Sequence, residues 1–99
     1  MSNKTAAIHP GEILREEFMR PMAISGYALA KGLHFPGIYE VVREERAISA
    51  DTAIRLGKYF GLPAQFWLNL QDAFAVQQVR RKYSKELNAI QPLARAMAR

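Results

Sequence analysis

The sequence predicts an all-α fold of five helices, followed by a helical extension at the C-terminus. Apolar residues such as Leu14 and Phe18 recur at the spacing of one helix face. Residues that favour helix ends separate these segments, as Ser25 does before one of them and Gly61 after another. No segment shows the alternation of apolar and polar residues that a half-buried strand requires.

The size and composition indicate one small cytoplasmic domain. The chain has 99 residues, of which 49% are hydrophobic and 23% charged, and this balance is ordinary for a globular protein. It has no cysteine, which excludes disulfides and thiolate metal sites and fits a reducing compartment. The sequence contains neither the long apolar run of a membrane span nor the pattern of a signal peptide.

The first helix is expected to begin near Pro10 and to end near Pro21. Proline suits the first turn of a helix, where its missing N–H is not needed, and it disfavours helical backbone at the residue before it. Leu14, Phe18 and Met22 lie four residues apart and are expected to form one buried stripe.

The next two segments have the pattern of a helix-turn-helix. Ser25 can cap a short helix over residues 26–33, and a second short segment follows Pro36. In that segment Ile38, Val41 and Val42 are expected to face the core. Two short helices joined by a tight turn are typical of a helix-turn-helix.

Two longer helices and a weaker one complete the pattern. Ser49 is expected to cap a helix that ends at Gly61, and Pro63 can open the next one. Ser84 is a candidate cap for a short last helix, which Pro92 interrupts. The helix after Pro63 carries a stripe wider than one small domain is expected to cover, which makes it a candidate core and homodimer interface: Phe66, Trp67, Leu70 and Phe74.

The net charge of +5 is unevenly distributed. Residues 1–75 hold eight basic and eight acidic side chains, whereas residues 76–99 hold six basic ones and a single acidic one. A basic segment can attract nucleic acid, an acidic protein or anionic lipid, or it can be a solvated tail. The predicted organisation is a flexible N-terminus (residues 1–8), a helix-turn-helix domain (residues 9–78) and a basic extension (residues 79–99).

Several motifs together resemble the HigA-type antitoxins, which belong to the larger lambda-repressor-like helix-turn-helix group. "HPGEILREEF" begins at His9, "RAIS" begins at Arg46, and "FWLNLQ" begins at Phe66, in this order. The resemblance covers residues 8–77. It implies a five-helix DNA-binding fold, a homodimer, repression of the protein's own operon at an operator, and neutralisation of a HigB-like ribonuclease toxin that cleaves messenger RNA.

The sequence departs from the family pattern where the reading helix begins. Family members usually carry several polar residues between the positions of Pro36 and Ile38, whereas only Gly37 stands there in this chain. The missing positions open the recognition helix, whose first residues contact base edges. The expected DNA contacts combine the start of the scaffold helix with the remaining outer positions of the recognition helix: Ser25, Tyr27, Gly37, Tyr39, Glu40, Arg43 and Arg46.

Catalysis finds no support in the sequence. It has two histidines, His9 and His34, and neither belongs to a metal-binding or catalytic motif. We therefore expect no enzyme activity, no metal and no cofactor. Two alternatives to the antitoxin remain open. One is a stand-alone helix-turn-helix regulator without a toxin. The other is a toxin-binding protein with weakened operator binding, since residues 1–75 carry no net charge and reading residues are missing.

Overall fold

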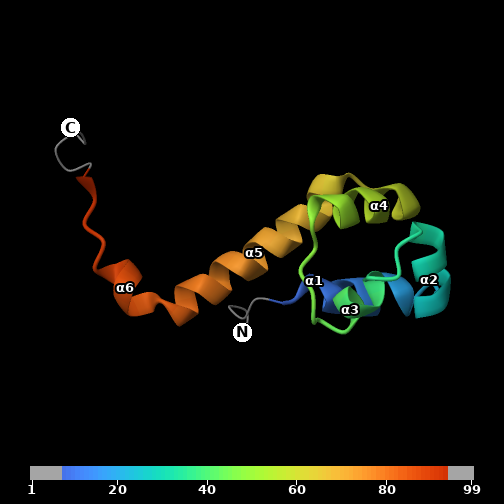
Figure 1. The fold of residues 1–99 in the computed structure, drawn as a ribbon, viewed down its shortest axis with the longest axis horizontal. Coiled ribbons are helices and arrows are strands. Elements are labelled where there is room, and N and C mark those ends of the chain that lie inside the picture. The colour runs from blue at the N-terminus through green and yellow to red at the C-terminus, as the bar shows by residue number, and fades with distance from the viewer. Residues whose placement is uncertain (1–7, 94–99) are drawn as a thin grey trace.

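The computed structural model describes residues 8–93, and within this range every regular element is a helix. In chain order the elements are α1 (Pro10–Ile13), η1 (Leu14–Met19), α2 (Gly26–Leu33), α3 (Ile38–Val42), α4 (Ala50–Phe60), α5 (Ala64–Lys82) and α6 (Ser84–Asn88). Since α1 and η1 run on as one helix, α1 to α5 form the five-helix domain and α6 the helical extension (Figure 1). The predicted all-α fold class is confirmed.

The second half of the first helix is wound more widely than an α-helix. The N–H of Arg20 donates to the carbonyl of Arg15 at 3.0 Å, which is the spacing of a π-helix. Leu14 at the start of this segment is fully buried, and Met19 at its end is only 7% exposed. Met22 follows in the turn and is 56% exposed, so the prediction that it continues the buried stripe is wrong.

Local signals at most helix ends act as the sequence indicates. The hydroxyl oxygens of Ser25 and Ser49 accept hydrogen bonds from backbone N–H groups three residues later, at 3.0 and 3.2 Å. Gly61 ends α4 in the left-handed conformation, with φ of 76°. Ser84 is an exception: it is the first residue of α6, whose cap position is Tyr83.

The core lies where the first helix, α2, α3, α4 and the start of α5 meet. Ile38 and Val41 are both fully buried, which confirms that the short α3 turns its apolar side inward. Trp67 is also fully buried, and three phenylalanine rings surround it at centroid distances of 4.9, 6.0 and 5.0 Å: Phe18, Phe60 and Phe66. Aromatic pairs at such distances contribute stability beyond the area they bury.

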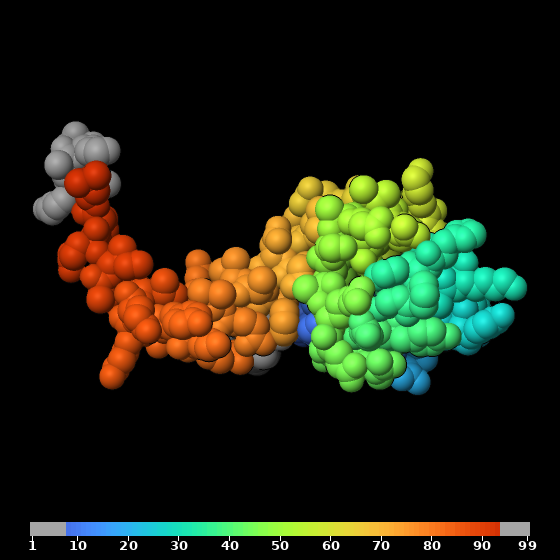
Figure 2. Space-filling view, viewed as in Figure 1, coloured from blue at the N-terminus to red at the C-terminus, as the bar shows by residue number. Residues whose placement is uncertain are grey.

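The second half of α5 projects from this core together with α6 (Figures 1 and 2). The chain therefore extends over 54 × 27 × 22 Å. Helix α5 continues without a break through residues 78 and 79, where the sequence divides the domain from the basic extension. None of the helices in residues 8–93 combines the length and apolar composition needed to cross a bilayer.

His9 holds the start of α1, and its protonation is expected to destabilise the fold. Its Nδ1 accepts a hydrogen bond from the N–H of Gly11 at 2.9 Å, which requires an unprotonated nitrogen. Partial burial lowers the pKa of His9 below its ordinary value of 6.5, and nearby Arg15 lowers it further, although Glu44 acts in the opposite direction.

The free energy of unfolding is therefore expected to fall as the pH is lowered from about 7 to 5. The unfolded chain takes up the His9 proton near pH 6.5 and the folded chain only at lower pH. Urea unfolding across this range measures the slope. His9→Asn keeps a capping oxygen without titrating, so it should flatten the slope; an unchanged slope would assign it to other groups. Glu16 does not interfere with this measurement. Arg20 and Arg15 lower the pKa of Glu16 to about 2, so its contribution to the free energy of unfolding is lost only below pH 4.5, the ordinary pKa of a glutamate.

Candidate nucleic-acid interface

Helices α2 and α3 form the predicted helix-turn-helix, with a second helix of only five residues. The turn begins at His34, which has φ of 55°, a conformation that histidine tolerates less readily than glycine. Gly37 precedes α3 without a side-chain cap bond. Because Ile38 and Val41 point into the core, Tyr39 and Glu40 are the residues left to face outward near the start of α3.

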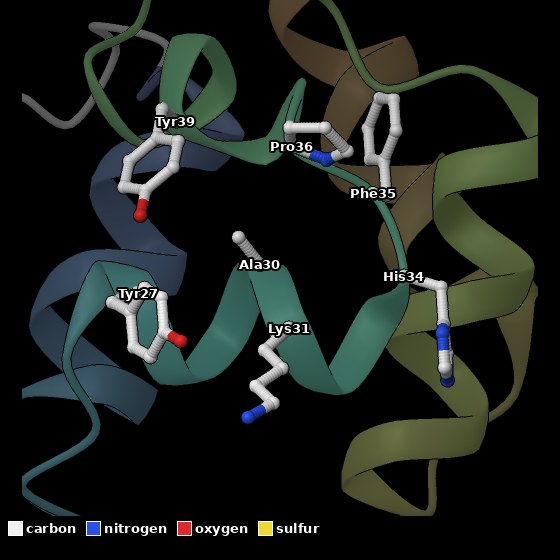
Figure 3. A pocket seen from close by; sticks show the side chains of 7 residues that line it. All are labelled: Tyr27, Ala30, Lys31, His34, Phe35, Pro36 and Tyr39. Atoms are coloured by element: carbon white, nitrogen blue, oxygen red, sulfur yellow. The ribbon is translucent and has the colours of Figure 1, made fainter.

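A hollow of about 380 Å³ opens between α2 and α3 (Figure 3). The side chain of Tyr39 extends from α3 into the space above α2, and Tyr27 lies on α2 at the same end of the hollow. Pro36 and Phe35 form the opposite edge. The complete lining of the hollow is Tyr27, Ala30, Lys31, His34, Phe35, Pro36 and Tyr39.

The structure brings Ser25, Tyr27 and Tyr39 to one end of this surface. A Cβ atom on Gly26, between the two α2 residues, would lie 3.0 Å from the Tyr39 ring, so the start of α2 packs against that ring. Ser25 is exposed, and Tyr27 and Tyr39 are 67% and 38% exposed. An exposed helix start with two nearby hydroxyl groups offers hydrogen-bond donors to a phosphate.

The two candidate arginines are paired with carboxylates in the unbound chain. Nε of Arg43 lies 3.2 Å from Glu45, and Nε of Arg46 lies 2.8 Å from Glu40. Since all four side chains are about half exposed, these pairs contribute little stability and a phosphate can compete for the guanidinium groups. A Cβ on Gly37 would lie 2.7 Å from Arg46, so Arg46 packs over the start of α3, whereas Arg43 lies at its far end.

Lys31 also belongs to this surface, although no motif in the sequence indicates it. Its ammonium lies 5.8 Å from the centroid of the Tyr27 ring and lines the hollow. Within residues 8–93 it forms no ion pair with a carboxylate, unlike Arg43 and Arg46. The four-residue spacing from Tyr27 could have revealed it, because side chains at that spacing share a helix face.

Arg15 holds the end of α3 against the first helix. One of its terminal nitrogens donates to the carbonyl of Val42 at 2.6 Å, and the other pairs with Glu44 at 2.9 Å. Glu44 has φ of 65°, a conformation that non-glycine residues rarely adopt. The hydrogen bonds that Arg15 donates to the carboxylates of Glu44 and Glu16 raise the pKa of Arg15. The strained turn after α3 is therefore held by a charged side chain that is far away in sequence.

The four residues predicted for a dimer interface lie on α5, away from α2 and α3. Trp67 has no exposed area, so it belongs to the core of a single chain and leaves no surface for a partner to contact. Phe66 and Leu70 are half-buried against the core, and the rings of Phe74 and His9 meet edge to face with their centroids 4.9 Å apart. Across residues 8–93, no cluster of His, Asp and Glu side chains has the geometry of a metal site.

Comparison with known proteins finds relatives that match most of the chain. No protein-family model matches the sequence. The chain is 51% identical over 94 residues to virulence-associated protein I of Dichelobacter nodosus, covering 93% of this chain and 86% of that protein. It is 33% identical over 92 residues to antitoxin HigA-1 of Vibrio cholerae, covering 91% and 87%.

The fold of the chain is also similar to that of a solved structure. The chain superposes on Pseudomonas aeruginosa antitoxin HigA, solved with the higBA promoter, with a TM-score of 0.84 and 48% sequence identity. The match covers 88% of this chain and 98% of that one. With its short helix pair and five-helix domain, the chain belongs to the HigA-type antitoxins of the lambda-repressor-like helix-turn-helix family.

Proposed function

We propose that the chain is the antitoxin of a type II toxin–antitoxin module. In this role it binds operator DNA, represses its own operon and neutralises a partner toxin that cleaves messenger RNA. The observation that carries the proposal is the match over nearly the whole of a HigA antitoxin that was solved with its promoter. Operator binding implies a cytoplasmic protein.

The surface beside the hollow is the proposed DNA contact. Ser25 and Tyr27 at the start of α2, together with Lys31, supply donors and a positive charge for phosphates. Tyr39 is the long side chain nearest the shortened start of α3, so it is the candidate for a base or sugar contact. Arg43 contacts phosphate or a base after releasing Glu45. The recognition surface also includes Gly37, Glu40 and Arg46.

An operator titration tests this role and its main alternative. The protein's own promoter is expected to bind at least about 100-fold more tightly than unrelated DNA, with a steep dependence on salt. Equal, weak binding to both duplexes would instead support a toxin-binding protein with weakened operator binding. The five-residue α3 and the paired Arg43 and Arg46 favour that alternative. A short basic ribonuclease-like reading frame directly upstream would favour an antitoxin over a stand-alone regulator.

Arg43→Ala is expected to lower promoter affinity by about 1–3 kcal/mol, because the variant loses a charged contact to phosphate or a base. Mobility-shift titrations with promoter and unrelated DNA measure the loss. A loss on both duplexes indicates a phosphate contact, and a loss on the promoter alone indicates base reading. Glu86→Ala is a control on the distant α6. Unchanged promoter affinity of Arg43→Ala would remove this residue from the interface.

A homodimer interface on the projecting part of the chain completes the proposal. Beyond the predicted stripe, the segment from α5 through Tyr83 to α6 exposes four large apolar side chains, each between 37% and 48% exposed: Val76, Val79, Tyr83 and Leu87. Ala75, Val76, Val79, Arg80 and Leu87 line a groove of about 380 Å³. A second copy seated there would cover this apolar surface and present two recognition helices to one operator.

Val79→Asp is expected to weaken the dimer by about 100-fold, because it places a charge in an apolar contact. Sedimentation velocity over a concentration series measures the association. Gln78→Asp introduces the same charge at an exposed neighbouring position on α5, and it should leave association unchanged. A Val79→Asp protein that remains as dimeric as the parent would exclude this groove from the interface.

A further inference from the structure

The turn between α2 and α3 is closed by its own backbone on one side. The N–H of Phe35 donates to the carbonyl of Ala30 at 3.0 Å, and the N–H of His34 donates to that of Lys31 at 3.1 Å. This pair of bonds is the Schellman motif, which satisfies carbonyls at the end of a helix. The carbonyls of Leu33 and His34 have no part in it and need other donors.

Arg55 supplies those donors from α4. Its Nη1 donates to the carbonyl of Leu33 at 2.8 Å and to that of His34 at 3.0 Å. Its Nε lies 3.1 Å from both carboxylate oxygens of Asp51, one turn earlier on the same helix. The planar guanidinium is therefore fixed on α4 and joins it to the turn, which lies 21 and 22 residues earlier in the sequence.

The Arg55 guanidinium also packs against the ring of Phe35, the residue after His34 in the turn. The centres of the Arg55 and Arg46 guanidinium groups lie 5.7 and 5.6 Å from the centroid of the Phe35 ring. Arg46 in turn pairs with Glu40 of α3. Contacts thus run from Asp51 through Arg55, Phe35 and Arg46 to the recognition helix.

These contacts matter because α3 cannot hold its own orientation. A helix of five residues is far shorter than the length at which isolated helices become stable. Its start is also uncapped by any side chain. Its position therefore depends on the turn, and the turn depends on the donors that reach it from α4.

We propose that Arg55 is a positioning residue for operator recognition: by holding the carbonyls of Leu33 and His34, it sets where α3 and Tyr39 meet DNA. Arg55 does this from α4 without contacting a base itself. The proposal rests on the DNA-binding role proposed above. It predicts that loss of Arg55 reduces the preference for the operator more than it reduces general affinity for DNA.

The test compares Arg55→Ala and Arg55→Lys with Lys58→Ala, which removes a positive charge from an exposed position on the same helix. Competition titrations use the promoter duplex and an unrelated duplex of equal length at one salt concentration. Both Arg55 variants are expected to lose the promoter preference by about tenfold, because a lysine cannot bond two carbonyls and Asp51 in one plane. Their affinity for unrelated DNA should change no more than that of Lys58→Ala.

Amide hydrogen exchange on the free protein gives a second readout. The N–H groups of Phe35 and Tyr39, which bond within the turn, are expected to exchange faster in both Arg55 variants, while that of Ala53 in α4 is not. Equal losses on both duplexes, or an Arg55→Lys protein that behaves as the parent, would overturn the proposal. Should Arg55→Ala fail to fold, Arg55→Lys decides alone. A parent protein without promoter preference would refute the DNA-binding role, and the exchange rates would then decide whether Arg55 positions the turn.

Discussion

Replacing Gly11 with Ala is expected to lower the free energy of unfolding by about 3 kcal/mol, because the added methyl group has no room. A Cβ atom at Gly11 would lie only 1.9 Å from the carbonyl oxygen of Val41. That oxygen belongs to the backbone of α3, so it cannot swing away as a side chain could. The first helix and α3 must separate, and the recognition helix then loses its support. Urea unfolding measures the stability loss.

Gly32→Ala is the matched control for this prediction. A Cβ there would lie 2.5 Å from the Tyr59 ring, but that ring is 40% exposed and its end can move. Alanine also favours a helix interior over glycine by about 1 kcal/mol, so Gly32→Ala is expected to be neutral or stabilising. If Gly11→Ala proved as harmless as Gly32→Ala, the close approach of the first helix to α3 would be refuted.

Trp67→Ala is expected to cost about 4 kcal/mol, because it removes the largest fully buried side chain of the core. The Nε1–H of this tryptophan meets no acceptor in the part of the chain that the structure describes. An unpaired buried donor costs about 1–3 kcal/mol. Trp67→Phe removes that donor together with some volume, so its net effect should stay within about 1 kcal/mol. Urea unfolding of both variants measures the difference.

Protein concentration separates a core role of Trp67 from an interface role. Loss of a core side chain destabilises each chain equally at every concentration, whereas loss of an interface side chain acts through association. The Trp67→Ala effect should therefore be the same in dilute and in concentrated solution. An effect that disappears on dilution would place this side chain in the dimer contact.

Much of the fold is readable from the sequence because it depends on near neighbours along the chain. Ser25 and Ser49 cap helices through backbone groups three residues away, and Gly61 ends α4 by its own backbone conformation. The spacing of Ile38 and Val41 alone places both in the core. The predicted sixth helix also forms, although Ser84 begins it as a helical residue and not as its cap.

The candidate site is harder to predict from the sequence, because the charge that its arginines present depends on which carboxylates they pair with. The sequence selects Arg43 and Arg46 as cations for DNA, yet each lies against a glutamate in the folded chain. The spacing of Lys31 from Tyr27 places both on one face of α2, but only the folded chain shows that this face lines the hollow between α2 and α3. Arg43 and Glu45 are two residues apart and Glu40 and Arg46 six, so these pairs depend on how the backbone turns after α3, which periodicity does not specify.

The sequence by itself determined the helix order, most helix ends, the inward side of α3 and the family. Only the tertiary structure decided which side chains hold the shortened recognition helix: Gly11, Arg15 and Arg55. Arg15 reaches the carbonyl of Val42 across 27 residues of chain, and Arg55 reaches that of Leu33 across 22. Local propensity acts over a few residues, whereas these contacts exist only after distant helices pack together. For that reason the sequence could predict a recognition helix but not the contacts that position it.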